Sequence, residues 1–173
     1  MEENQPKTGK IALKYGLFLG GASVIFAFML YLADMHYQAG TPVFIISVVL
    51  MLAAIIIGMI QFKKENNGFI TFGQGFKIGV GICLIAGVIG VIFNQLMVNV
   101  IDPDMMEKAM EFQKATLMES GDLTPEQINA QIEMGKNFTT PTMQIAFGLL
   151  GSVFMGLILS LIPALVIKKT KPE

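Results

Sequence analysis

The chain has 173 residues, of which 53% are hydrophobic and only 14% are charged, and its formal net charge is −1 at pH 7. Soluble domains carry about 25% charged residues, so this composition argues against a soluble globular protein. The length suits one domain. The lysines form no stripe interleaved with aromatic residues, which predicts no nucleic-acid partner.

The charged residues avoid four long windows of the chain. No Asp, Glu, Lys or Arg occurs in 15–33, 43–62, 78–101 or 137–167. Each window reaches or exceeds the roughly 18 residues that mark a candidate transmembrane helix. The sequence therefore predicts a single all-α membrane domain, residues 1–173, with spans at about 11–32, 43–62, 76–100 and 143–167.

A cleaved signal peptide is the alternative interpretation of the first span. Three lysines precede the uncharged run at 15–33, as in a cleaved signal peptide, but the bulky Tyr31 stands where a cleavage site needs a small residue. A retained helix is therefore expected.

His36, the only histidine, follows in a short loop at 33–42. We expect it to be a solvated side chain at the membrane surface rather than a pH sensor.

A polar segment separates the second span from the third. Residues 62–79 read FKKENNGFITFGQGFKIG and contain three lysines and the turn signal Asn66-Asn67-Gly68. Phe69 to Phe72 is predicted to be a short apolar piece at the membrane interface, so that the third span begins near Phe76.

The loop at 101–141 predicts an amphipathic helical hairpin. Asp102-Pro103 reads as an N-cap followed by proline at the first helical position, and 104–119 has an apolar and a polar side. Thr124-Pro125-Glu126-Gln127 has the form of a capping box that starts a second helix. The hairpin could lie on the bilayer, dock a partner or pack onto the mouth of the bundle. We favour packing onto the mouth.

Lysine positions predict the orientation. Nine of the twelve lysines lie before residue 15, at 63–77 or after 167, while the loop at 101–141 has three lysines against eight carboxylates. Because positive residues favour the cytoplasmic side, both termini and residues 62–79 are predicted to be cytoplasmic and the acidic loop extracytoplasmic.

Small residues at four-residue spacing predict where the helices pack, because they allow close backbone approach in lipid. The predicted packing residues are Gly148, Ser152, Gly156, Ser160, Gly79, Gly87, Gly16 and Gly20. We expect packing within one bundle, with homodimerisation through the fourth span as the alternative. Four polar residues near the outer ends of the third and fourth spans could line a shallow vestibule: Asn94, Gln95, Asn99 and Gln144. Hydrogen bonds between the helices are the alternative for these residues, and we favour it.

Catalytic signatures are missing from the sequence. It contains no phosphate-binding or dinucleotide-binding glycine motif and no HExxH. One histidine and one cysteine, Cys83, are too few for a usual zinc site. We therefore expect no enzyme, no cofactor and no metal. Two functions remain open: a structural or partner-binding membrane protein that uses its acidic loop, or a small transporter or channel component that acts as an oligomer. The lipid bilayer, a homo-oligomer and a periplasmic or membrane protein are the partners to consider.

Three segments carry a resemblance to a known family. KKENNGFITFGQGFKIG, NVIDPDMMEKAMEFQK and LTPEQINAQIEMGKNF resemble the bacterial membrane family labelled domain of unknown function 4199, over about residues 8–170. The resemblance implies four transmembrane helices in the inner membrane of a Gram-negative bacterium, with the acidic loop in the periplasm. It implies no activity, cofactor or catalytic residue.

Overall fold

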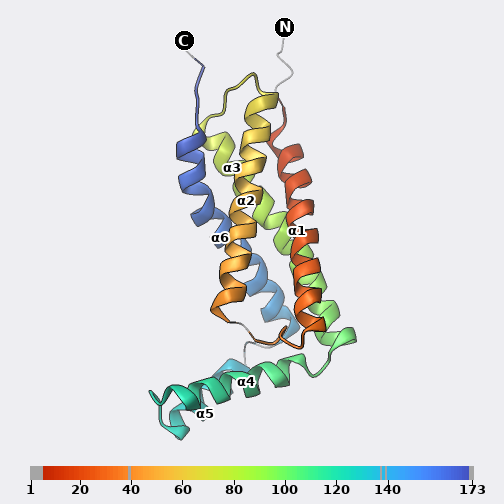
Figure 1. The fold of residues 1–173 in the computed structure, drawn as a ribbon, viewed down its shortest axis with the longest axis vertical. Coiled ribbons are helices and arrows are strands. Elements are labelled where there is room, and N and C mark those ends of the chain that lie inside the picture. Colours follow the sequence, from red (N-terminus) through yellow and green to blue (C-terminus); the bar gives the residue numbers. More distant parts are fainter. Residues whose placement is uncertain (1–5, 39, 137, 139, 172–173) are drawn as a thin grey trace.

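The computed structural model describes residues 6–171, apart from 39, 137 and 139. Its elements in chain order are α1 (Thr8–Leu32), α2 (Thr41–Glu65), α3 (Phe72–Leu96), the π-helical turn η1 (Met97–Ile101), α4 (Met105–Ser120), α5 (Pro125–Lys136) and α6 (Pro141–Ile167). Four helices are long and apolar enough to cross a membrane: α1, α2, α3 with η1, and α6. They form one bundle, and α4 and α5 lie beyond one end of it (Figure 1).

The start of α3 differs from the sequence prediction. The Thr71 hydroxyl accepts a hydrogen bond from the Gln74 backbone at 3.2 Å, and the Gln74 side chain accepts one from the Thr71 backbone at 2.9 Å. This capping box starts the helix at Phe72 rather than near Phe76. The short piece predicted at Phe69 to Phe72 is divided in the structure, because Phe72 is the first residue of α3. Ile70 is 1% exposed and forms a two-hydrogen-bond antiparallel bridge with Lys169.

Helices α1 and α6 pack along opposite sides of α3, which therefore forms the centre of the bundle. The side facing α1 carries Ile85 and Ile89, which lie against Gly16 and Gly20. The side facing α6 carries residues 79, 83, 87 and 91, which are offset from 85 and 89 by two residues, or about half a turn. α2 closes the bundle by contacts with α1, α3 and α6.

All eight predicted packing residues lie at these contacts. A Cβ at Gly79 would collide with Ser160, and one at Gly87 with Ser152. Gly156 lies against Val80 and Cys83, and Gly148 against Val91. The small residues of α6 therefore face α3 within the same chain. A homodimer formed through this side of α6 would have to displace α3.

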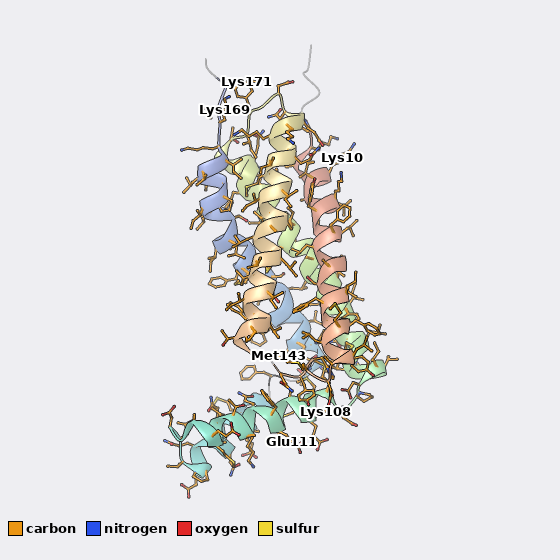
Figure 2. All side chains as sticks on the ribbon, viewed as in Figure 1. Lys10, Lys108, Glu111, Met143, Lys169 and Lys171 are labelled. Atoms are coloured by element: carbon orange, nitrogen blue, oxygen red, sulfur yellow. The ribbon has the colours of Figure 1, made fainter. Side chains whose placement is uncertain are left out.

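The buried core is concentrated in one half of the bundle. Ile55, Met59, Phe62, Ile78 and Ile82 are fully buried, and all lie nearer the end where α2 stops and α3 starts. We call this the lysine-rich end, because Lys10, Lys169 and Lys171 gather there (Figure 2). Here Lys63 donates to the Ile167 carbonyl at 2.8 Å and joins α2 to the end of α6.

The opposite, acidic end of the bundle is less tightly packed. Among the described residues of the four spans, Met97 is the buried apolar side chain at this end, and cavities separate the helices there. The arm, which we define as α4 and α5 (Met105–Lys136), runs across the bundle axis at this end (Figure 1). The buried core therefore lies toward the lysine-rich end, and the arm adjoins the end at which fewer side chains are buried.

Candidate functional site

The candidate site lies at the acidic end, where α3 gives way to the arm. Here α3 widens into η1, and the backbone N–H of Asp102 donates to the Met97 carbonyl at 2.8 Å. A single π-helical turn within a helix is rare and is frequently found at functional sites. In this chain it ends the span at Ile101 and places Asp102 beside the loop that follows α1.

Asp102 is the centre of a three-residue polar cluster. Its Oδ2 lies 2.7 Å from His36 Nε2, and Lys108 Nζ donates to both carboxylate oxygens at 2.9 Å. The side chains of His36 and Asp102 are only 5% and 9% exposed, whereas that of Lys108 is 42% exposed. The cluster thereby ties the α1–α2 loop, the end of the third span and the first turns of α4 together.

The charges in this cluster shift the pKa values of two of its members. Hydrogen bonds from Lys108, and then from His36, lower the pKa of Asp102 below its usual value, against the opposing effect of burial. The hydrogen bond to Asp102 raises the pKa of Lys108, and the nearby Asp104 and Asp34 carboxylates add to this. Asp102 is therefore held as a carboxylate and Lys108 as an ammonium ion.

The environment of His36 corrects two sequence predictions. A solvated His36 is wrong, because its ring packs edge-on against Tyr31 and Tyr37, at centroid distances of 5.0 and 5.3 Å, and is hydrogen-bonded to Asp102. An N-cap role for Asp102 is also wrong, since α4 begins at Met105 with Asp104 at its N-cap. The Asp102 side chain bonds to His36 and Lys108 instead of the first backbone N–H groups.

One nitrogen of His36 has no partner among the described residues. An ionised carboxylate only accepts hydrogen bonds, so the Nε2–H group of His36 donates this hydrogen bond to Asp102. Nδ1 is buried and makes no hydrogen bond within the described part of the chain. Sequence reasoning missed this pair, although the only histidine and an Asp-Pro at the end of a span were both predicted on the same side of the membrane.

Three of the four predicted vestibule residues line one cavity. Asn94, Gln95 and Gln144 line a cavity of about 600 Å³ between α3 and α6, which we call the α3–α6 cavity. Gln95 Nε2 donates to Gln144 Oε1 at 3.1 Å. Asn99 lies outside this lining and donates to the Gln95 carbonyl at 2.7 Å. The polar side chains of the cavity are the neutral amides of Asn94, Gln95 and Gln144, which can both donate and accept hydrogen bonds.

A second cavity of about 220 Å³ adjoins the polar cluster. It lies between α1 and α3, and His36, Ser23 and Met105 are among its lining residues. Gly90 and Asn94 line both cavities. The α3–α6 cavity, the second cavity and the His36–Asp102–Lys108 cluster therefore form one continuous region around the last three turns of α3.

The arm contacts this region only at its first half. Met105 and Met106 line the two cavities, and Phe112 lies against Tyr37 at a ring distance of 6.3 Å. α5 packs on α4 around the buried Ile128 and has no comparable contact with the spans. The Thr124–Gln127 capping box that starts α5 is confirmed, with hydrogen bonds of 2.9 and 3.3 Å. The start of α4 thus packs onto the mouth of the bundle, as predicted for the hairpin, whereas the rest of the arm does not.

Metal chemistry finds no support in the described residues, which contain no group of three or more His, Cys, Asp or Glu side chains that could hold an ion. The site combines neutral amides, one buried ion-paired cluster and an arm of carboxylates and methionines. Together with four membrane-crossing helices, this defines a multi-pass helical membrane protein.

The comparisons place the chain within that class. The chain belongs to the family described as protein of unknown function (DUF4199), whose model matches residues 14–169. No curated protein and no solved structure matches it. The match begins within α1, covers α2 to α5 in full and ends just beyond α6.

Proposed function

We propose that this protein is a non-enzymatic, multi-pass inner-membrane protein that presents its acidic arm to a protein partner outside the cytoplasm. The way the arm is held supports this proposal. Its root is fixed by the Asp102 cluster, while its far half leaves Met118 and Met134 51% and 63% exposed. An arm that served only to cap the bundle would bury these side chains against it.

The charge distribution supports the proposed orientation. The lysine-rich end and the arm lie at opposite ends of the bundle, as Lys10 and Lys169 at one end and Glu111 at the other illustrate (Figure 2). Positive residues are retained on the cytoplasmic side during insertion. We infer that both termini are cytoplasmic and that the arm is periplasmic in a Gram-negative host.

The surface of the arm indicates the chemistry of its partner. Exposed Phe112, Met118 and Met134 are accompanied by exposed carboxylates at Glu107, Glu111, Glu119, Asp122, Glu126 and Glu133. Protein interfaces commonly have an apolar centre within a charged rim, and methionine and aromatic residues are enriched in them. A partner with an apolar patch bordered by lysine or arginine would match this surface.

Co-purification from native membranes tests this function. Met118→Ser or Met134→Ser should lower recovery of the specific partner about fivefold or more, as expected for an interface side chain worth at least about 1 kcal/mol. Met35→Ser is the matched control, because Met35 is 45% exposed at the same end but lies outside the arm. Loss of the same protein from all three variants, or from none, would contradict the proposal.

The α3–α6 cavity favours a second candidate function, a small transporter or channel component that acts as an oligomer. It is lined by neutral polar side chains at one end and extends to Gly87, which lies about halfway along the third span. Labelling of Gly90→Cys in a Cys83→Ala background by a water-soluble maleimide would support this function, because Gly90 lines the same cavity and a Cβ there meets nothing within 4 Å. Protection of Gly90→Cys, with labelling of Gln95→Cys, would leave only a shallow vestibule.

A further inference from the structure

A groove between α1 and α2 lies at the lysine-rich half of the bundle, away from the candidate site. Its volume is about 490 Å³, within the roughly 300–1,000 Å³ range of ligand pockets. It is lined by Lys14, Tyr15, Phe18, Leu19, Ala22, Leu50, Ala54 and Ile57. We call it the α1–α2 groove.

The packing of α1 explains why the groove exists. Gly16 and Gly20 bring α1 close to α3, and α1 packs far more extensively on α3 than on α2. Ala22 and Ala54 are too short to fill the space left between α1 and α2. The groove follows α1 from Lys14 to Ala22, a rise of about 12 Å. Within a bilayer it would be filled by hydrocarbon.

The groove has charge at only one end. Lys14 is its single charged lining residue, and the remaining lining is apolar or aromatic. Lys14 is exposed, with Nζ 5.7 Å from the centroid of the Tyr15 ring, and it forms no ion pair with a described residue. Among the described residues of this end, Glu65 is the one carboxylate, and its Oε1 accepts a hydrogen bond from Gln61 at 2.8 Å. The positive charge at the mouth of the groove is therefore not paired with any carboxylate of the described residues.

We propose that the α1–α2 groove binds an anionic phospholipid, with one acyl chain between the helices and the phosphate against Lys14. A cationic mouth above an apolar slot matches a ligand with an anionic head and a hydrocarbon tail. Basic pockets between membrane helices on the cytoplasmic side bind anionic headgroups in other proteins. The neighbouring lysines at 7, 10 and 77 add to the positive potential at this end. This site lies at the opposite end from the arm and does not depend on the function proposed for the arm.

Two variants test separately what the phospholipid headgroup and the acyl chain contribute to binding. Lys14→Gln removes the charge from an exposed position and should lower the affinity for phosphatidylglycerol about fivefold, the effect of one lysine near an anionic headgroup. Ala22→Leu should fill the slot from an exposed position and lower the affinity for any lipid chain. Lys64→Gln, which removes an exposed lysine outside the groove, controls for general charge. Gly21→Leu controls for added bulk, because a Cβ there meets nothing within 4 Å.

Native mass spectrometry of the full chain in detergent provides the measurement, with phosphatidylglycerol, phosphatidylcholine, oleic acid and inorganic phosphate as separate probes. The wild-type chain and both controls should retain one phosphatidylglycerol in preference to phosphatidylcholine. Lys14→Gln should lose the preference, and Ala22→Leu should lose the lipid. Equal retention of phosphatidylglycerol and phosphatidylcholine, equal effects of Lys14→Gln and Lys64→Gln, or retention by Ala22→Leu would each overturn the proposal. Displacement by oleic acid or inorganic phosphate at equal concentration would overturn the assignment to a phospholipid.

Discussion

His36 and Asp102 are 66 residues apart in the sequence, yet Nε2 and Oδ2 lie 2.7 Å apart in the fold. The contact joins the loop after α1 to the corner at which α3 gives way to the arm. Lys108 bonds to the same carboxylate from α4. The direction in which the arm leaves the bundle is therefore set by side chains from three segments.

Loss of the Asp102 carboxylate should loosen the root of the arm. Asp102→Asn replaces a charged acceptor that binds His36 and Lys108 by a neutral amide, and charge-assisted hydrogen bonds are the stronger kind. Amide hydrogen exchange in 33–38 and 103–110 should become several-fold faster, while exchange in α1 to α3 stays unchanged. Asp122→Asn is the control, because Asp122 is exposed in the arm and lies outside the cluster. Unchanged exchange in Asp102→Asn would show that the cluster does not hold the arm.

The lowered pKa of Asp102 predicts how the arm responds to acid. Because this pKa is lower in the folded than in the unfolded chain, the stabilisation is present above the unfolded value and is lost as pH falls through the folded value. Lys108→Met removes the largest cause of the shift, so the pKa should move back toward 3.8. The arm of the variant should therefore detach at a higher pH than that of the wild type.

A spin label at Ser120→Cys in a Cys83→Ala background would report detachment as increased mobility during an acid titration. Lys114→Met, on the same helix but outside the cluster, should keep the wild-type midpoint. A midpoint that is the same in Lys108→Met as in the wild type would exclude Lys108 as the cause of the lowered pKa.

Close packing of α3 on α6 predicts that an added side chain at this contact destabilises the protein. Gly79→Ala adds a Cβ that would collide with Ser160, and overpacking of this kind typically costs about 1–3 kcal/mol. Gly151→Ala is the control on α6, because a Cβ there meets nothing within 4 Å. Reversible unfolding in mixed micelles should show a lower free energy of unfolding for Gly79→Ala alone. Equal free energies for the two variants would argue against this contact.

The sequence predicted the four apolar helices and the helical arm because runs without charge and capping motifs are local signals. It placed the start of α3 four residues late, since the apolar Phe72 gave no sign of the Thr71–Gln74 capping box around it. The His36–Asp102 pair was missed because a contact between distant segments depends on how the helices pack. The expected hydrogen bonding between the third and fourth spans is confirmed by Gln95 and Gln144, which both lie near the same ends of two predicted spans.

The central claim is that four helices cross a membrane and leave the lysine-rich end and the arm on opposite sides of it. Single cysteines at Glu65→Cys and Asp122→Cys, in a Cys83→Ala background, test it most directly with a membrane-impermeant maleimide on intact spheroplasts. Both positions are exposed, so burial does not limit labelling. Asp122→Cys should react in intact spheroplasts, whereas Glu65→Cys should react only after the membrane is opened. Reaction of both cysteines, or of neither, before the membrane is opened would contradict the account.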